Sequence, residues 1–402
     1  MTTYDMKAGR LHIDKIHKEE RKMKKRFLAI VLSTVMALSM VACGGAKEET
    51  PAATETPAAT EEAATEEAAP EASGEAYHFE ILVKSFQSTY WQAAVKGINQ
   101  ACAELGVTAN CNGPANESDI ADQVQMLDAA IEAAPDGIGL AACDTSSVLD
   151  SLAVALEKGI PVVCFDTGID NAPEGSVYAT VATDNVAAGA CAATNMFPVI
   201  EAKIAAATAD APVRIGEVNQ DATALNIQQR GLGFINEMIK LCNAAGKQVK
   251  VEGNEFYVNA AEGAVADGAE VIIEVGVPAQ TTVDLASTEA NKIMSKDDTI
   301  AIFGSNQTTA EGVITANQTL NVLGADGIIA AGFDAGTPQK AAINAGQFIG
   351  SVTQSPLMQG YHCIYTLVDI CNGEAVEDMP MDGYWYNTEN MTADDIAPNL
   401  YD

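Results

Sequence analysis

The feature that most constrains the fold is an alternation of short apolar segments and amphipathic segments, which starts at His78 and continues almost to the C-terminus. Several of the short segments, such as residues 161–165 and 299–303, are nearly pure apolar runs, as in buried strands, and the amphipathic segments repeat apolar residues every three or four positions, as helices do. Strands that alternate with helices predict parallel sheets with right-handed crossover connections. The alternation pauses after residues 177–181 and restarts at residues 213–218. We therefore predict an α/β fold with two doubly wound parallel-sheet lobes.

The alternation assigns a strand or a helix to most of the chain after His78. The strands are expected at residues 79–83, 107–111, 137–142, 161–165, 177–181, 213–218, 249–256, 271–275, 299–303, 328–333 and 348–352. The helices are expected at residues 91–105, 120–131, 147–158, 224–245, 260–267, 283–294, 308–321, 338–345 and 356–372. Residues 182–212 receive no predicted element.

Several predicted strands are followed by polar or charged side chains. Lys84, Asp144 and Asp166 follow strands of the first half, and Asn306 and Asp334 follow strands of the second half. In open α/β sheets the carboxyl ends of the strands face one crevice, where ligands bind. We therefore expect these side chains to converge on one binding site, although Asp144 could instead cap the helix that follows it.

A sugar is the kind of ligand that such a crevice suits. Each sugar hydroxyl donates and accepts hydrogen bonds, so it matches carboxylate, amide and cationic side chains. The C–H face of a sugar ring packs against an aromatic side chain. Tyr90 and Trp91, in the loop before the first helix, could supply this aromatic face.

Asp166, Thr167 and Gly168 raise a different possibility, because Asp-Thr-Gly is the signature of aspartic proteases. The pepsin-like fold is all-β, whereas this signature lies between predicted helices. The second, similar motif is also imperfect, since Ala335 follows Asp334. The alternation of strands and helices therefore disfavours an aspartic-protease-like enzyme, which stays a remote alternative.

We expect no cofactor, no metal and no enzymatic activity. No G-x-G-x-x-G follows a predicted strand, and neither a Walker motif nor a Cys-x-x-Cys pair occurs. After Cys43 the only histidines are His78, at the start of a strand, and His362, inside a helix, and neither is placed as a catalytic base. The eight cysteines after Cys43 are scattered singly, as small buried residues are. A disulfide among them stays open.

The N-terminus predicts a secreted, lipid-anchored protein. Residues 23–26 are basic and a 16-residue apolar run follows at residues 27–42, which is typical of a secretory signal and too short for a spanning helix. The run ends in a sequence that is similar to a bacterial lipobox, with Cys43 as the acylated residue. Residues 1–22 resemble an upstream extension, so either Met1 or Met23 could be the start. Residues 44–77, rich in Ala, Glu, Thr and Pro, predict a disordered acidic tether.

The charge of the chain argues against nucleic acid as a partner. Without residues 1–43, 13 Lys and Arg remain against 51 Asp and Glu, a formal net charge of −38. Such a chain repels nucleic acid and anionic lipid headgroups.

Seven motifs together resemble the periplasmic sugar-binding proteins of the ribose/galactose/arabinose type, the substrate-binding components of ABC importers. The resemblance covers residues 79–390. The motifs are ILVKSFQSTYWQAAVKG, GIPVVCFDTGI, ATDNVAAGA, QQRGLGF, AIFGSNQ, AAGFDAG and SVTQSP, which occur in the order and at the spacing of that family.

The resemblance implies roles for individual residues, and together with the strand ends it gives the expected ligand-binding set. Lys84 matches a sugar-contacting lysine, Tyr90 and Trp91 match two aromatic positions, and Asp166 matches an aspartate that binds hydroxyls. Arg230 matches a ring-contacting arginine, and Asn226 lies four residues earlier on the same helical face. The full expected set is Lys84, Tyr90, Trp91, Asp144, Asp166, Thr183, Asn226, Arg230, Asn306, Phe333, Asp334 and Gln354.

The resemblance also implies the domain organisation and the partners. Residues 78–183 and 355–385 are expected to form the first lobe and residues 184–354 and 386–402 the second, joined by a three-strand hinge near Thr183, Gln354 and residues 384–387. We expect a monomer outside the cytoplasm, anchored to the membrane through Cys43, that passes a monosaccharide to the permease subunits of an ABC transporter.

Departures from the family leave the ligand open. Ribose binders have Asp-Arg where this chain has Asp166 and Thr167, and Asn where it has Ala141. Ribose would therefore leave hydroxyls unpaired, at a cost of about 1–3 kcal/mol each. A receptor for a non-sugar polyol or a furanone-like signalling molecule is the alternative on the same fold. A sugar-responsive repressor would need a basic helix-turn-helix in place of the signal and the acidic tether.

Overall fold

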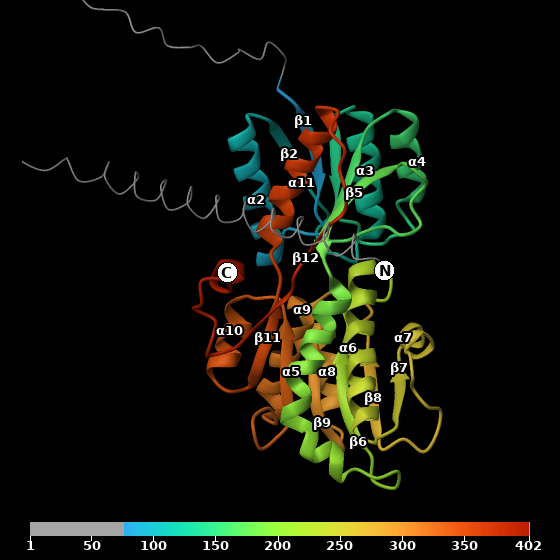
Figure 1. The fold of residues 1–402 in the computed structure, drawn as a ribbon, viewed down its shortest axis with the longest axis vertical. Helices are drawn as coiled ribbons and strands as arrows, with labels where there is room; N and C mark the ends of the chain where they lie inside the picture. The colour runs from blue at the N-terminus through green and yellow to red at the C-terminus, as the bar shows by residue number, and fades with distance from the viewer. Residues whose placement is uncertain (1–75, 402) are drawn as a thin grey trace, which may run out of the picture. The chain divides into compact units, whose positions relative to one another are not determined.

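The structure is a computed structural model that describes residues 76–401. The predictions of an upstream extension, a signal segment, lipidation at Cys43 and a tether up to residue 75 lie outside the described residues. All described elements belong to one compact unit that begins at Ser73. Within this unit the chain forms two lobes, each built on one sheet with helices on both faces (Figure 1). The predicted fold class is confirmed.

The first lobe contains a six-stranded, fully parallel sheet with the strand order β12-β5-β4-β3-β1-β2. Its strands are β1 (His78–Leu82), β2 (Thr108–Asn112), β3 (Gly137–Leu140), β4 (Val162–Phe165), β5 (Val177–Thr183) and β12 (Met379–Met381). One pair of packed helices covers each face of the sheet. The two pairs are α2 (Thr89–Leu105) with α11 (Pro356–Cys371), and α3 (Ile120–Glu132) with α4 (Leu149–Glu157).

The second lobe contains a seven-stranded sheet with the order β13-β11-β10-β9-β6-β8-β7, in which only the pair β11–β13 is antiparallel. Its strands are β6 (Val213–Val218), β7 (Val249–Gly253), β8 (Val271–Gly276), β9 (Thr299–Gly304), β10 (Ile329–Phe333), β11 (Phe348–Thr353) and β13 (Tyr384–Tyr386). One face of the sheet contacts α5 (Asn185–Ala206) and α6 (Leu225–Ala244). The other contacts α8 (Val283–Met294), α9 (Gln307–Leu320) and α10 (Thr337–Asn344).

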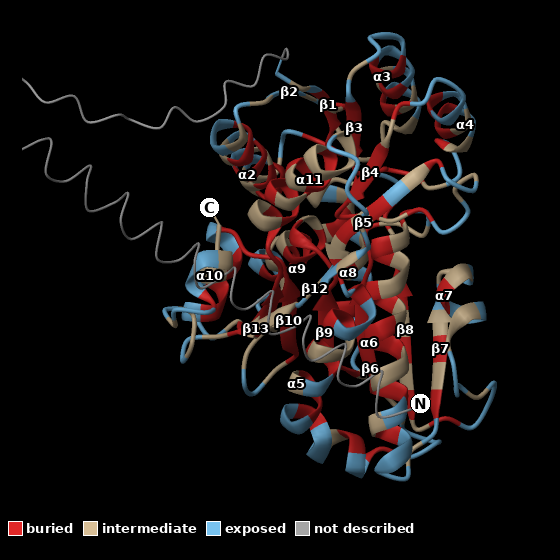
Figure 2. Cartoon of the chain, turned by 45° about the horizontal axis from the view of Figure 1, so that its top comes forward, coloured by how far each residue is buried: buried red, intermediate tan, exposed pale blue. Residues whose placement is uncertain are grey.

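Burial follows this layered arrangement. Figure 2 shows that the central strands of both sheets are buried, whereas the outer surfaces of α3, α4 and α5 are exposed. Burial of apolar side chains between sheet and helices stabilises each lobe by roughly 25 cal/mol for every Å² removed from water. The carboxyl ends of the strands, where the polar side chains follow, are the ends that meet between the lobes (Figure 1).

The chain crosses between the lobes three times: after β5, after β11, and between β12 and β13. The third crossing differs from the expected boundary, which assigned residues up to 385 to the first lobe. Tyr384 pairs with Thr353 of β11, so the crossing lies at residues 382–383. Trp385 therefore belongs to the second lobe, because its side chain packs against the core of that lobe.

Helix α5 was not predicted from the sequence. Eight of its 22 residues are alanine and apolar residues also lie on its exposed side, so the contrast between its buried and exposed faces is weak. The small residues instead permit a close approach to α6. A Cβ on Gly189 would lie 2.0 Å from the backbone oxygen of Arg230, which only glycine avoids.

The prediction around β7 was wrong at two points. We expected a strand at residues 249–256 and a helix at residues 260–267, but β7 ends at Gly253 and the short helix α7 spans Glu255–Ala260. The helix starts earlier because the Asn254 side chain accepts a hydrogen bond from the backbone N–H of Phe256, 3.0 Å away. Gly253 has a φ of 104°, which ends the strand just before the cap.

Three further properties concern residues 76–401. None of the helices in this part of the chain is both long enough and apolar enough to cross a membrane. All eight cysteines there are unpaired thiols. Nowhere in the same range are three His, Cys, Asp or Glu side chains grouped so that they could hold a metal ion.

Candidate functional site

Two aspartates occupy equivalent positions in the two lobes. Asp166 directly follows β4, and Asp334 directly follows β10. Both have left-handed backbone conformations, with φ values of 63° and 71°, which aspartate tolerates better than most residues. Each backbone N–H bonds to the neighbouring strand, Asp166 to Val181 at 2.9 Å and Asp334 to Val352 at 2.6 Å. The backbone therefore fixes both carboxylates at the sheet ends that face the other lobe.

Most of the expected binding residues line one cavity between the lobes, with a volume of about 30 Å³. Of the expected set, the cavity is lined by Lys84, Tyr90, Trp91, Asp166, Asn226, Arg230, Asn306, Asp334 and Gln354. Asp144, Thr183 and Phe333 are not among its lining residues. A larger groove of about 550 Å³ runs past Tyr178 and Pro380, but it contains only Thr183 of the expected residues. We place the site in the smaller cavity because the buried charged groups converge there.

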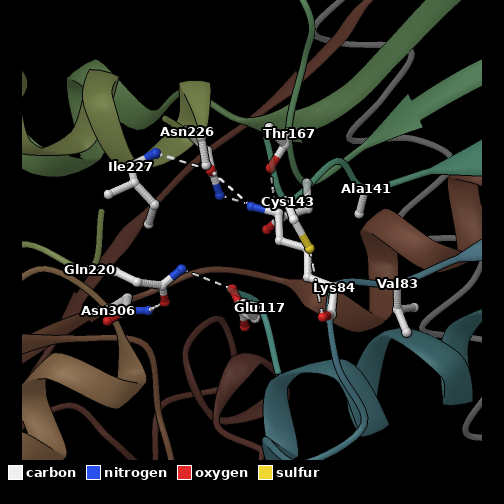
Figure 3. Close-up of polar contacts among 12 residues, drawn as sticks. Val83, Lys84, Glu117, Ala141, Cys143, Thr167, Gln220, Asn226, Ile227 and Asn306 are labelled. Atoms are coloured by element: carbon white, nitrogen blue, oxygen red, sulfur yellow. Dashed lines mark hydrogen bonds and ion pairs between the residues drawn. The ribbon is translucent and has the colours of Figure 1, made fainter. Parts of the chain in front are cut away.

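Lys84, Asp166 and Asn226 connect the two lobes across this cavity. The Lys84 Nζ lies 3.4 Å from Asp166 Oδ2 and donates to Asn226 Oδ1 at 3.1 Å. Asn226, from the first turn of α6, also donates to Asp166 Oδ2 at 3.0 Å. Figure 3 shows Lys84 and Asn226 directed toward each other. Burial lowers the pKa of Lys84, but the nearby carboxylates of Asp166 and Glu117 outweigh burial and raise the pKa above its usual value.

Arg230 is held in one orientation from three sides. Its guanidinium lies 3.6 Å from the ring centre of Phe333, a cation–π contact. It donates to Asn185 Oδ1 through Nε and Nη2, at 3.2 and 2.7 Å, and through Nη1 to the Ser305 carbonyl at 2.9 Å. The Phe333 ring, which is fully buried, thus packs against the face of the Arg230 guanidinium. We expected Phe333 to stack on a ligand, but the structure places its ring under Arg230.

Asp334 connects the cavity to the hinge. Its Oδ1 accepts from Gln354 Nε2 at 2.7 Å and its Oδ2 from the backbone N–H of Gln307 at 2.9 Å. Gln354 Oε1 in turn accepts from the Thr183 hydroxyl at 2.7 Å. Thr183 therefore acts on the site through Gln354 rather than from the cavity wall. Burial raises the pKa of Asp334, although the Arg230 charge and the Gln354 hydrogen bond partly oppose this.

Tyr90 contacts Asp166 directly. The Tyr90 hydroxyl lies 2.5 Å from Asp166 Oδ1 and 3.0 Å from Gln359 Oε1. Gln359, on α11, donates to the Thr183 hydroxyl at 2.9 Å. Burial, together with the negative charge of Asp166, raises the pKa of Tyr90 well above its usual value, so its hydroxyl is neutral and donates a hydrogen bond.

Glu117 and Gln220 are site residues that sequence reasoning missed. Glu117 accepts from the Trp91 indole N–H at 2.8 Å and from Gln220 Nε2 at 2.9 Å. Gln220 also accepts a hydrogen bond from the Asn306 amide, as Figure 3 shows. Glu117 belongs to the first lobe and Gln220 to the second, so this chain of contacts also crosses the cavity. Burial raises the pKa of Glu117, although Lys84 and the two donors partly oppose this.

A signal for both missed residues exists in the sequence. Glu117 lies five residues beyond the end of β2, and Gln220 lies two residues beyond the end of β6. The rule that identified Asp166 and Asp334, polar side chains after strand ends, applies equally to these two strands. Neither residue was in the expected set.

Asp144 also follows the end of a strand, β3, but it does not line the cavity. Its Oδ1 accepts four hydrogen bonds from the backbone N–H groups and hydroxyls of Ser146 and Ser147, at 2.7–3.0 Å. Burial alone would raise the pKa of Asp144, but these hydrogen bonds lower it below its usual value. Of its two expected roles, the contacts in the structure correspond to capping, here of the turn that precedes α4.

Comparisons with known proteins identify relatives of this chain. A family model described as a periplasmic binding protein domain matches residues 79–375. The D-allose-binding periplasmic protein of Escherichia coli (strain K12) is 24% identical over 305 residues, which cover 73% of this chain and 84% of that protein. Among solved structures, a protein described as an ABC transporter, LacI family transcriptional regulator from Brachyspira murdochii has a TM-score of 0.68 and 29% identity, covering 81% of this chain and 99% of its own. An ABC transporter solute binding protein from Agrobacterium vitis with bound D-fucose has a TM-score of 0.67 and 25% identity, covering 81% of this chain and 100% of its own.

Proposed function

The chain belongs to the periplasmic binding protein family, and from this premise we propose that it captures a monosaccharide between its lobes and delivers it to the permease of an ABC importer. The two relatives named above with a sugar in their descriptions concern D-allose and D-fucose, which supports a monosaccharide as the ligand. No bond of the ligand is broken, because the protein acts by binding and release.

One observation supports this proposal most strongly: buried donors and acceptors from both lobes converge on one cavity. The first lobe contributes Lys84 and Asp166, and the second contributes Arg230 and Asp334. All four side chains are at most 4% exposed. Charged groups buried in this way are stable only when hydrogen-bonded or paired, and the hydroxyls of a sugar provide both donors and acceptors for them. We propose that these four, with Asn226, Asn306 and Gln354, contact the sugar.

Sugar entry requires the lobes to separate. The cavity of about 30 Å³ corresponds to roughly one water molecule, far less than a monosaccharide needs. The contacts Asn226–Asp166 and Gln220–Glu117 join the lobes directly. We propose that sugar hydroxyls replace part of these contacts, while the three crossings act as the hinge of an opening and closing motion.

A thermal-shift panel of aldoses, ketoses, polyols and furanone-like compounds tests the proposed function. A ligand at 100 times its dissociation constant stabilises the folded protein by about 2.7 kcal/mol, which raises Tm by about 4 °C in a chain of this size. We expect at least one monosaccharide to produce this shift. If no monosaccharide raises Tm, the proposal of a monosaccharide ligand is refuted. If polyols or furanone-like compounds raise Tm instead, the ligand belongs to one of those classes.

We further propose that the protein is a monomer held at the outer face of the cell membrane by a lipid on Cys43. The family is extracytoplasmic, and the basic and apolar residues before Cys43 have the composition of a lipoprotein signal. We expect Cys43→Ser to move the protein from the membrane fraction to the soluble fraction in cell fractionation. Persistence of the variant in the membrane fraction would argue against lipidation at Cys43.

A further inference from the structure

The C-terminal segment reaches the cavity from outside. After the short 3-10 helix at Ala397–Asn399, the chain places Tyr401 against residues of both lobes. Its ring lies 5.8 Å from the ring of Tyr90, centre to centre, in an edge-to-face arrangement. Its hydroxyl accepts from the backbone N–H of Ala335 at 3.2 Å and interacts electrostatically with the Asp334 carboxylate. Tyr401 thus contacts Tyr90 of the first lobe and interacts electrostatically with Asp334 of the second, and both of these residues line the cavity.

This segment is fixed to the second lobe. The Thr353 hydroxyl donates to the Asn399 carbonyl at 2.7 Å, and Lys340 Nζ donates to the Tyr401 carbonyl at 3.4 Å. Ile396 is buried, and Leu400 packs against the core that α8, α9 and α10 share. Figure 1 shows the C-terminal segment beside α10. Tyr401 therefore extends from a fixed position on one lobe toward Tyr90 of the other.

We propose that Tyr401 is a positioning residue of the sugar site: its ring supports Tyr90 when the lobes are closed, and its hydroxyl orients the Asp334 carboxylate. This inference rests on the proposed function, because it assigns Tyr401 to the same site. An edge-to-face aromatic pair between the lobes forms only in the closed arrangement, so it stabilises that arrangement over an open one. A hydroxyl donor on Asp334, in addition to the Gln354 amide and the Gln307 N–H, restricts which carboxylate lone pairs remain available to a ligand.

The hydroxyl has a separate consequence for the pH dependence of binding. Burial raises the pKa of Tyr401 well above its usual value, so its hydroxyl stays neutral and stabilises the ionised form of Asp334. The other charged or titratable groups that act on Asp334 are Arg230 and Asp166, and the phenols of Tyr90 and Tyr386 also interact with it. Removing the Tyr401 hydroxyl therefore shifts the titration of Asp334 to higher pH.

The test compares Tyr401→Phe and Tyr401→Ala with the wild type and with Tyr178→Ala, a control tyrosine that is 48% exposed and lies away from the cavity. D-allose and D-fucose are the first probes, followed by the monosaccharide with the largest thermal shift. In calorimetry at pH 7 we expect Tyr401→Ala to weaken binding by about 10- to 100-fold, through faster dissociation. We expect Tyr401→Phe to retain most of the affinity at high pH and to lose it at a higher pH than the wild type as the pH falls.

The outcomes separate this inference from the proposed function. If the wild type binds a sugar and Tyr401→Ala binds it equally well, the inference is wrong and the proposed function stands. If the wild type binds no monosaccharide, the proposed function fails, and small-angle scattering of the free protein decides the inference. The expected result is then a larger radius of gyration for Tyr401→Ala than for the wild type and Tyr178→Ala, and equal radii overturn it.

Discussion

Replacing Arg230 by alanine is expected to reduce sugar affinity at least about 100-fold, or about 3 kcal/mol, while the protein stays folded. Arg230 is 1% exposed and its guanidinium is held by Phe333, Asn185 and Ser305, so it is oriented before a ligand arrives. Truncation removes charge-assisted donors from the site and leaves Asp334 without a nearby positive charge. Calorimetric titration measures the affinity, and circular dichroism verifies the fold.

Arg214→Ala is the matched control for this substitution. Arg214 is another largely buried arginine of the second lobe. It lies near the start of β6, whereas the cavity lies beyond the end of that strand, and it forms ion pairs with Glu252, Glu274 and Asp298. We expect this variant to lose stability and to bind sugar with the affinity of the wild type. Normal binding by Arg230→Ala, or equal losses in both variants, would show that Arg230 has no specific role in the site.

Replacing Asp166 by asparagine is expected to have a similarly large effect, again at least about 100-fold in affinity. Asparagine tolerates the left-handed backbone at this position, so the substitution changes charge and hydrogen bonding rather than the turn. The acceptor Oδ2 that contacts Lys84 and Asn226 is lost if the amide nitrogen takes its place, and Lys84 loses its buried counter-charge. Asp166→Asn should therefore impair both the site and the contacts between the lobes.

Asp144→Asn provides the comparison for this prediction. Asp144 also follows a strand of the first sheet, but its hydrogen bonds go to Ser146 and Ser147, and it does not line the cavity. We expect Asp144→Asn to lower Tm and to leave the sugar affinity unchanged. The opposite pattern, with weak binding in Asp144→Asn and normal binding in Asp166→Asn, would move the site away from the cavity described here.

The sequence predicts most strands of this fold, and does so best where a strand is a short, continuous apolar run, whereas the three-residue strands β12 and β13 were not predicted. Val162–Phe165 illustrates this, since all four of its residues are buried and its limits differ from the prediction by one residue. Helix α5 escaped prediction because its many alanines weaken the contrast between its buried and exposed faces, and because its approach to α6 at Gly189 is a close contact with backbone. A contact between backbones leaves no periodic pattern in the sequence.

The site was predictable to the extent that strand ends indicate it. Asp166 and Asp334 lie where a parallel sheet presents its polar residues, and Glu117 and Gln220 obey the same rule. What the rule cannot decide is whether a carboxylate bonds to its own turn, as Asp144 does, because neighbouring serine hydroxyls compete for it. Tyr401 was beyond prediction, because its contact with Tyr90 depends on the path of the C-terminal segment across two lobes.

The most direct test of the central claim is a crystal structure of the protein with the monosaccharide that gives the largest thermal shift. We predict that the sugar lies between the lobes, with hydroxyl oxygens within about 3 Å of the Asp166 carboxylate and the Arg230 guanidinium. A sugar bound instead in the groove past Tyr178, without contact to Asp166 or Arg230, would contradict it.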